Sequence, residues 1–202
     1  MEETNIVGRV LRASTTGFDC GTRSRSIDEK HTFGSFVKVP IDESRQVHAI
    51  GLIYAIRIDD DPLARELVMA NGVDPNVLMD QRDNRMVPVE IGIINVGYSV
   101  NGTMFQALPP RPPLSLTDVV LCNAQEVYDF TQHCEYFRLV LNAGEVPADE
   151  LLAAALRYAS LVYEDETDRY NFLVMCGRQL ATLLSNDLRR LAHVIALIKP
   201  DS

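Results

Sequence analysis

The residues whose charge and spacing could bind a ligand lie near the N-terminus, in a short basic stretch. Arg23 and Arg25 alternate with Ser24 and Ser26, and Lys30 follows. Guanidinium groups present a planar set of N–H donors that fits carboxylate and phosphate groups. Arg23, Arg25 and Lys30 are therefore the candidate contacts for an anion or an acidic partner. The alternative is a solvated loop with no binding role.

Residues that often serve in metal or acid–base chemistry are not arranged in a known motif. The histidines are isolated from one another and lack the spacing of zinc ligands; they are His31, His48, His133 and His193. The run Asp59-Asp60-Asp61 places consecutive carboxylates in alternating directions, so we interpret it as a strand end followed by a helix cap. The sequence therefore predicts no metal site.

Motifs for nucleotide binding or for nucleophilic catalysis are also absent. The sequence contains no phosphate-binding loop of the form G-x-x-x-x-G-K-[ST], no G-x-G-x-x-G after a strand and no G-x-S-x-G. We therefore predict no catalytic residue and no cofactor. An enzyme whose site is assembled from distant residues is the alternative, and a pocket containing His48, Asp59 or Asp61, or the Arg23 and Arg25 loop, would favour it.

The cysteines and the apolar runs indicate a reduced, soluble protein. The four cysteines are far apart and form no C-x-x-C pair, so a disulfide framework is not expected; they are Cys20, Cys122, Cys134 and Cys176. The N-terminus is acidic and is followed by no signal-peptide core, and no apolar run approaches the roughly 18–20 residues of a membrane span. We expect a cytoplasmic protein.

The charge balance bears on the kind of partner. The net charge is −9, with 12 Lys/Arg against 15 Asp/Glu in residues 1–112 and 7 against 13 in residues 113–202. Binding to nucleic acid over a broad surface requires clustered Lys and Arg, which release counterions from the phosphates. The composition therefore disfavours nucleic acid and anionic membranes, and it favours a protein partner.

Six short strands are predicted before residue 108, where apolar residues alternate with polar ones or run together between turn residues. They are expected over residues 5–13, 18–20, 36–41, 47–58, 87–98 and 104–107. The run from Val47 to Ile58 is apolar enough to be buried on both faces, and Gly51 predicts a bend or bulge in it. Asn101-Gly102 predicts a hairpin turn.

A helix is predicted from Asp61 to Asn71, between the fourth and fifth strands, because Asp61 can cap it and Pro62 fits its first position. Closure of a small sheet removes its exposed edges, and glycines allow the strands to bend. We therefore expect the first half to be a small closed β-barrel with one helical insertion.

Four prolines between Leu108 and Pro113 exclude a helix or a central strand and predict a stiff, extended spacer that leads out of the barrel. Beyond it, apolar residues recur every three or four positions. Helices are expected over residues 123–144, 148–163, 167–184 and 188–198, the first with a capping box of Asn123 and Glu126. The prediction is an α+β fold, with a barrel domain at 1–112 and an antiparallel helical bundle at 113–202, held as one rigid body.

Loose patterns of glycines and apolar residues in the first half carry a family resemblance. They are Ile6–Val10, Phe33–Val39, Ala49–Ile53, and Leu108–Leu114 before Val119–Leu121. Over about residues 5–125, the chain resembles the HAS barrel, the small barrel shared by HerA-type hexameric DNA translocases and the rotary ATP synthases. In that family a P-loop ATPase domain follows the barrel, whereas here a helical segment follows. The resemblance thus implies subunit assembly and docking of a partner such as a nuclease, without ATP hydrolysis.

These observations lead to one expectation and two alternatives. We expect a non-enzymatic interaction module, in which the barrel docks a protein partner, for example a DNA-processing ATPase or nuclease, and in which the chain can form a homo-oligomer. The alternatives are an enzyme with a dispersed small-molecule site and a nucleic-acid-binding barrel. The last would require a continuous basic face on residues 1–58, and the even spread of Asp and Glu there disfavours it.

Overall fold

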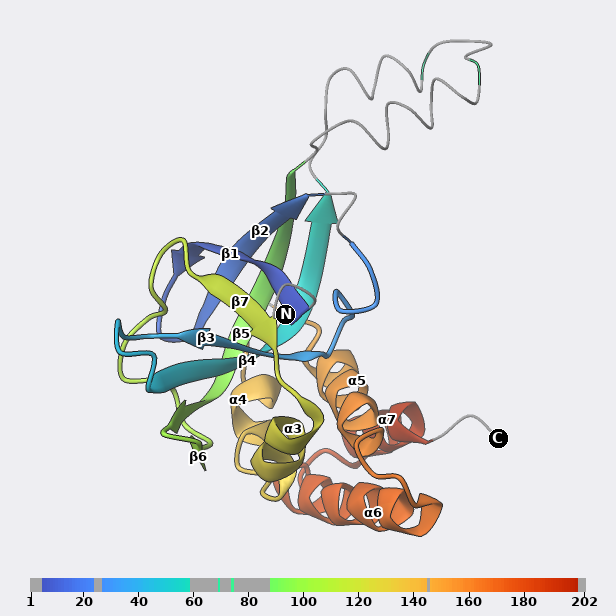
Figure 1. Ribbon diagram of the computed structural model, residues 1–202. Coiled ribbons are helices and arrows are strands. Elements are labelled where there is room, and N and C mark those ends of the chain that lie inside the picture. Colours follow the sequence, from blue (N-terminus) through green and yellow to red (C-terminus); the bar gives the residue numbers. More distant parts are fainter. Residues whose placement is uncertain are drawn as a thin grey trace.

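The computed structural model describes residues 5–23, 27–58, 69, 74, 88–144 and 146–199. It has an α+β fold, with a β-barrel at the N-terminal side and helices packed beneath it (Figure 1). Apart from Met69, the predicted helix from Asp61 to Asn71 lies outside the described residues, as do the three aspartates 59–61. Among the helices that the structure describes, none combines the length and the apolar character needed to cross a membrane.

Six antiparallel strands form the closed barrel. They follow one another around it in the order β2-β1-β7-β3-β4-β5, and the pairing of β2 with β5 closes the ring. A short extra strand, β6, extends β5 through the Asn101-Gly102 hairpin turn, in which both residues have positive φ, as predicted. The strands are β1 (Ile6–Ala13), β2 (Gly17–Arg23), β3 (Phe36–Pro40), β4 (Val47–Ile58), β5 (Pro88–Val100), β6 (Thr103–Phe105) and β7 (Asp118–Leu121).

Strand β4 lies between two hydrophobic cores. Its five residues Ala49–Ile53 are all buried. Successive side chains of a strand point to opposite faces, so Ala49 and Ile53 fill the barrel interior, whereas Ile50 and Leu52 pack into the core shared with the helices. The predicted burial of this strand on both faces is confirmed. A register shift does fall between Ile50 and Gly51, but its extra residue is Val96 of β5; the residue that bulges from β4 is Tyr54.

The proline segment connects two strands and does not lead out of the barrel. It runs from β6 to β7, and the N–H of Leu114 at its end donates to the carbonyl of Pro40. Residues 118–121, which the sequence assigned to the helical domain, form β7 and pair with both β1 and β3. The predicted domain boundary at residue 112 therefore falls before the last strand of the barrel. The strand was missed because four residues are too few for the alternation of inward and outward side chains to be recognised. The barrel ends at Leu121, one residue before Cys122 and the cap of the first helix.

Five helices follow in the described part of the chain: α3 (Ala124–Thr131), α4 (Phe137–Leu141), α5 (Ala148–Ser160), α6 (Glu166–Leu183) and α7 (Leu188–Ile198). The predicted capping box is confirmed at α3, where Asn123 and Glu126 exchange side-chain to backbone hydrogen bonds of 2.9 Å. The Glu126 carboxylate also accepts a hydrogen bond from Lys38 of β3, which ties α3 to the barrel. In turn, α5 contacts α3, α4, α6 and α7, and Arg190 of α7 reaches Asp149 of α5 at 2.7 Å.

The prediction of one helix over residues 123–144 was wrong, because the chain breaks between α3 and α4. Gln106, which follows β6, supplies the reason. Its side-chain amide donates to the carbonyls of Phe130 and His133 and accepts from the N–H of Tyr136. These bonds satisfy backbone groups that a continuous helix would pair internally. The break lets Tyr136 and Phe137 both enter the core, with ring centroids 4.9 Å apart.

Candidate functional site

The basic stretch expected to contact an anion is not assembled into a site by the described residues. Arg23 ends β2 and lies opposite Pro88 of β5, while Arg25 lies outside the described part of the chain. The Lys30 ammonium lies 3.1 Å from the Asp28 carboxylate, and its side chain is only 18% exposed. Lys30 is therefore engaged within its own loop.

His48, offered as part of a dispersed enzyme site, stands on β4 away from a pocket. Partial burial, together with the charge of Lys38, lowers the pKa of its imidazole from the usual value of 6.5. The imidazole is therefore neutral at pH 7, and the charged side chains near it are those of Lys38, Glu126, Asp42 and Arg45. Among the described residues no three His, Cys, Asp or Glu side chains are placed to hold a metal ion.

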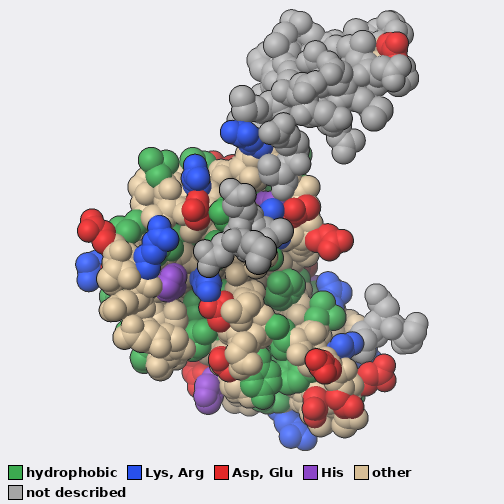
Figure 2. Space-filling model, in the orientation of Figure 1, with side chains coloured by type: hydrophobic (Ala, Val, Ile, Leu, Met, Phe, Trp, Pro, Cys, Tyr) green, Lys and Arg blue, Asp and Glu red, His purple; other side chains and the backbone are tan. Residues whose placement is uncertain are grey.

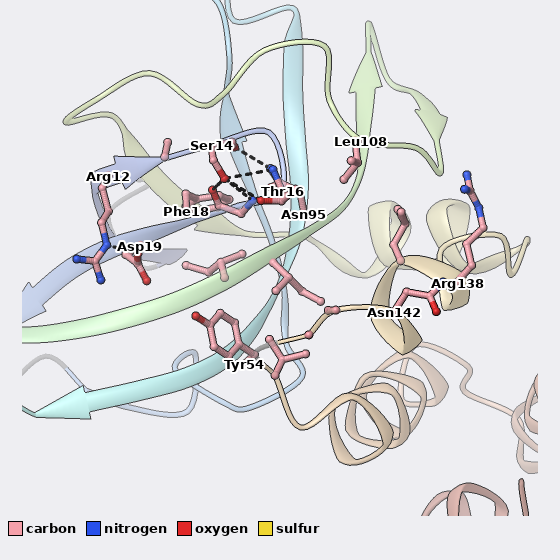
Figure 3. Close-up of a pocket in the computed structure, with 18 residues that line it drawn as sticks. Arg12, Ser14, Thr16, Phe18, Asp19, Tyr54, Asn95, Leu108, Arg138 and Asn142 are labelled. Atoms are coloured by element: carbon pink, nitrogen blue, oxygen red, sulfur yellow. Dashed lines mark hydrogen bonds and ion pairs between the residues drawn. The ribbon is translucent and has the colours of Figure 1, made fainter. Parts of the chain in front are cut away.

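A cleft of about 670 Å³ opens where the barrel meets the helical region (Figure 3). One wall is the turn between β1 and β2 with the adjoining part of β5. The other is α4 and the segment after it, which contributes Leu139, Ala143 and Val146. The barrel side adds Phe18 and Ile94, so much of the lining is apolar. Tyr54 of β4 and Leu108 complete the lining, so the cleft is built from five parts of the chain that are distant in sequence.

Asn95 supplies a buried polar group in this cleft. The residue is 2% exposed, and its side-chain nitrogen donates to the carbonyls of Thr15 at 3.0 Å and Ser14 at 3.4 Å. Two carbonyl acceptors on one side fix which end of the amide is the nitrogen. The other end, Oδ1, is buried and has no hydrogen-bond partner among the residues that the structure describes. A buried acceptor without a partner is costly, and because this oxygen has no exposed surface it lies beneath the lining of the cleft.

The turn that holds Asn95 is itself closely bonded. The Ser14 hydroxyl accepts from the N–H groups of Thr16 and Gly17, each at 3.2 Å, and lies 3.0 Å from the Thr16 hydroxyl. The Asn95 N–H donates to the Thr16 carbonyl at 2.9 Å. Gly17 allows this approach, because a Cβ there would lie 2.5 Å from the Ile93 carbonyl oxygen. The unpaired oxygen of Asn95 is therefore held rigidly.

Two bulges of the β4–β5 ladder border the cleft. Val96 is unmatched between the pairs Ile50–Gly97 and Gly51–Asn95, so the bulge follows Asn95 directly. Tyr54 is unmatched in the second bulge and lines the cleft (Figure 3). Bulges redirect side chains, and they often lie next to binding sites.

The charged groups of the cleft are paired at one end and free at the other. The Arg12 guanidinium donates to Asp19 at 2.6 Å and to Glu90 at 2.7 Å, and the hydrogen bond to Asp19 raises the pKa of Arg12. Arg138 of α4 has no ion pair within the described chain. Its guanidinium points away from the labelled barrel side chains (Figure 3). Among the described residues, the ionisable side chains along the cleft are these two arginines with Asp19 and Tyr54.

The cleft was not predicted from the sequence. The signal that could have pointed to it is Asn95 itself, the one amide in the apolar run Ile91–Val96. A buried polar residue is more informative than an exposed apolar one. No protein-family model matches the chain, and a search of curated proteins finds no match to its sequence.

Proposed function

We propose that this chain is a non-enzymatic interaction module whose barrel docks a protein partner, with the cleft receiving a segment of that partner. The observation that supports the proposal most is the cleft itself, which lies between the barrel and α4 and has walls made largely of apolar side chains. The volume of about 670 Å³ lies within the range of about 300–1,000 Å³ typical of binding pockets.

The chemistry of the lining favours binding over catalysis. Arginine stays protonated at all ordinary pH values, and the Asp19 carboxylate is held by Arg12. Of the ionisable groups along the cleft, this leaves the Tyr54 hydroxyl for proton transfer. A docking cleft needs no such group, whereas a hydrolase or transferase does.

The surface charge favours a protein as the partner. Lys and Arg side chains are interspersed with Asp and Glu over the face of the barrel in Figure 2, and the whole chain carries −9. The resemblance of the first half to the HAS barrel points in the same direction. It suggests a DNA-processing ATPase or a nuclease as the partner, and copies of this chain as neighbours in an oligomer.

A pair of matched variants tests the proposal. Gly144 lines the cleft, and a Cβ there would meet no atom within 4 Å, so Gly144→Phe can narrow the cleft without a backbone clash. Ala181→Phe adds the same ring on the exposed part of α6, away from the cleft. Each protein is immobilised and exposed to native lysate, and the bound proteins are quantified by mass spectrometry.

The expected result is one protein retained near one to one by the wild type and by Ala181→Phe, and lost from Gly144→Phe. If no protein is retained in stoichiometric amounts and the purified chain turns over a small molecule, docking is refuted and the alternative of an enzyme is favoured. Recovery of the same protein in equal amounts on all three baits would place docking elsewhere than in the cleft.

A further inference from the structure

We propose that Cys134 and Cys176 form an oxidation site, in which a peroxide converts the two thiols into a disulfide that fixes α6 to the connection between α3 and α4. Both cysteines are free, and the Cys176 thiol donates a hydrogen bond to the sulfur of Cys134. The two side chains belong to the same hydrophobic core, although they are far apart in the sequence. This inference does not depend on the docking function.

The packing of α6 places Cys176 beside Cys134. The buried residues of α6 recur every fourth position and form one stripe that faces the core; they are Phe172, Cys176 and Leu180. Phe172 stacks on Tyr163 with ring centroids 5.1 Å apart, and the Tyr163 hydroxyl accepts a hydrogen bond of 3.3 Å from Gln132. The stripe therefore lies against the connection that follows α3, and Cys176 is at its centre.

The connection that carries Cys134 is held in place by hydrogen bonds. The N–H of Phe137 donates to the Cys134 carbonyl at 3.1 Å, and Gln106 bonds the backbone of His133 and Tyr136 on either side. A disulfide brings its two sulfurs to about 2.05 Å, closer than two hydrogen-bonded thiols. Only three of the 18 residues of α6 are buried, so α6 can make the small movement that the bond requires.

Exposure and acidity identify Cys134 as the thiol that reacts first. Cys134 is 9% exposed and lies between the exposed residues His133 and Glu135, whereas Cys176 is fully buried. The hydrogen bond between the two thiols lowers the pKa of Cys134 and, together with burial, raises the pKa of Cys176. The thiolate is the reactive form, and redox-sensing cysteines combine access, a low pKa and a neighbouring second thiol.

The chemistry is a two-electron oxidation with hydrogen peroxide as the oxidant. The Cys134 thiolate attacks one peroxide oxygen, so that an S–O bond forms and the O–O bond breaks; the leaving hydroxide takes up the proton that Cys134 released and becomes water. The Cys176 sulfur then attacks the sulfur of this sulfenic acid. The S–S bond forms, the S–O bond breaks, and the hydroxide leaves with the Cys176 proton as a second water.

Tyr136 provides a hydrogen-bond donor next to the two sulfurs. Its side chain is fully buried, and its hydroxyl has no hydrogen-bond partner among the residues that the structure describes. Burial and then the nearby thiols of Cys176 and Cys134 raise its pKa, so the hydroxyl keeps its proton. This hydroxyl can donate to the sulfenic oxygen of Cys134, which satisfies a buried donor and stabilises the intermediate.

Cys122 is a matched control for exposure. It is 7% exposed, close to the value for Cys134. Burial and the charge of Glu126 raise the pKa of its thiol, and the opposing influence is the charge of Lys38 and not a second thiol. Cys122 should therefore react more slowly with peroxide and should form no disulfide within the chain.

The test maps the disulfide in the wild-type protein. The full chain is treated with an equimolar amount of hydrogen peroxide, denatured without reductant, alkylated and cleaved after glutamate. Because Glu126 separates Cys122 from Cys134, mass spectrometry identifies each cysteine. We expect the peptide of residues 127–135 to be linked to the peptide that contains Cys176, the intact chain to lose about 2 Da, and dithiothreitol to reverse both changes.

Variants test the order of attack and the effect on α6. Dimedone, which traps sulfenic acids, should label Cys134 in Cys176→Ser at least about tenfold more than in the wild type, where Cys176 removes the sulfenic acid. Cys122→Ser should form the disulfide as the wild type does. Amide hydrogen exchange in the second half of α6 should slow at least about threefold on oxidation of the wild type.

Three results would overturn the proposal or a part of it. Sulfinic acid on Cys134 without a link to Cys176, or links to Cys122 or between chains, would refute the pair, and this readout needs no substituted protein. Equal labelling of Cys176 by dimedone in Cys134→Ser would refute the order of attack. Unchanged amide exchange in α6 after oxidation would show that the disulfide does not fix the helix.

Discussion

Gly34 lies where the barrel meets α5, and replacing it with alanine should loosen that junction. Its φ is +87°, a region that residues with a Cβ rarely adopt. A Cβ on Gly34 would lie 2.7 Å from the Ala154 Cβ and 2.8 Å from backbone atoms of Ala154 and Ala155. Because part of this overlap is with helix backbone, a rotamer change cannot relieve it. Either α5 or the loop before β3 must move.

The magnitude follows from three contributions. The positive φ costs alanine about 1–2 kcal/mol, and an overpacked contact typically costs about 1–3 kcal/mol. The reduced freedom of the unfolded chain returns about 0.4–1 kcal/mol. The free energy of unfolding of Gly34→Ala should therefore fall by about 3 kcal/mol. With a urea dependence near 2 kcal/mol per M, the midpoint should fall by about 1.5 M.

Two other glycines serve as controls. Gly102 has a similar φ of +85° but no neighbour that a Cβ would meet within 4 Å, so Gly102→Ala measures the backbone strain alone. Gly144 has neither feature, so Gly144→Ala should stay within about 0.5 kcal/mol of the wild type. The difference between Gly34→Ala and Gly102→Ala isolates the overlap with α5.

Urea unfolding followed by circular dichroism at 222 nm and by tyrosine fluorescence provides the assay, since the chain has seven tyrosines and no tryptophan. Because β3, β4, β5 and the helices share one hydrophobic core, we expect the barrel and the helices to unfold together, so that both signals give the same urea midpoint. A loss no larger in Gly34→Ala than in Gly102→Ala would refute the close contact between Gly34 and α5. Separate transitions for the two signals would refute the shared core as the cooperative unit.

Three further predictions concern single side chains. Asn123→Ala removes the capping box of α3 and should lower the free energy of unfolding by about 1 kcal/mol; no change in urea midpoint would contradict the cap. Burial lowers the pKa of the His48 imidazole in the folded state, so as the pH falls the unfolded chain takes up the proton at a higher pH than the folded chain does. Stability should therefore fall as the pH drops below about 6.5, and His48→Gln should reduce that slope between pH 6.5 and 5; an unchanged slope would contradict it. The hydrogen bond from Cys176 lowers the pKa of the Cys134 thiol, whereas burial raises the pKa of Cys20 to about 12. Mass spectrometry of the native protein with iodoacetamide at pH 8 should thus find Cys134 modified before Cys20, and the reverse order would contradict the pairing.

Features that depend on neighbouring residues in the sequence were predicted correctly. The capping box of Asn123 and Glu126, the Asn101-Gly102 turn and the extent of β4 each follow from side chains and backbone preferences within a few positions. Closure of the strands into a barrel also followed, because a short sheet with apolar faces has to remove its edges.

Features decided by contacts between distant segments were not predicted. A side chain from residue 106 ends α3, although the apolar period runs on through Phe137. β7 is a strand because β1 and β3 offer it partners, and its four residues carry no clear local signal. The basic stretch of Arg23 and Lys30 was chosen from local composition, and the structure places these residues outside the cleft.

Local patterns were enough to place the barrel strands other than β7, the cap of α3 and the change from sheet to helix, because period, turn residues and capping residues act over a few bonds. That the β1–β2 turn, Asn95 and the segment after α4 meet is a result of long-range packing. That meeting depends on barrel closure, which sets β2 beside β5, and on the packing of α5 against Gly34. Together these contacts enclose the cleft.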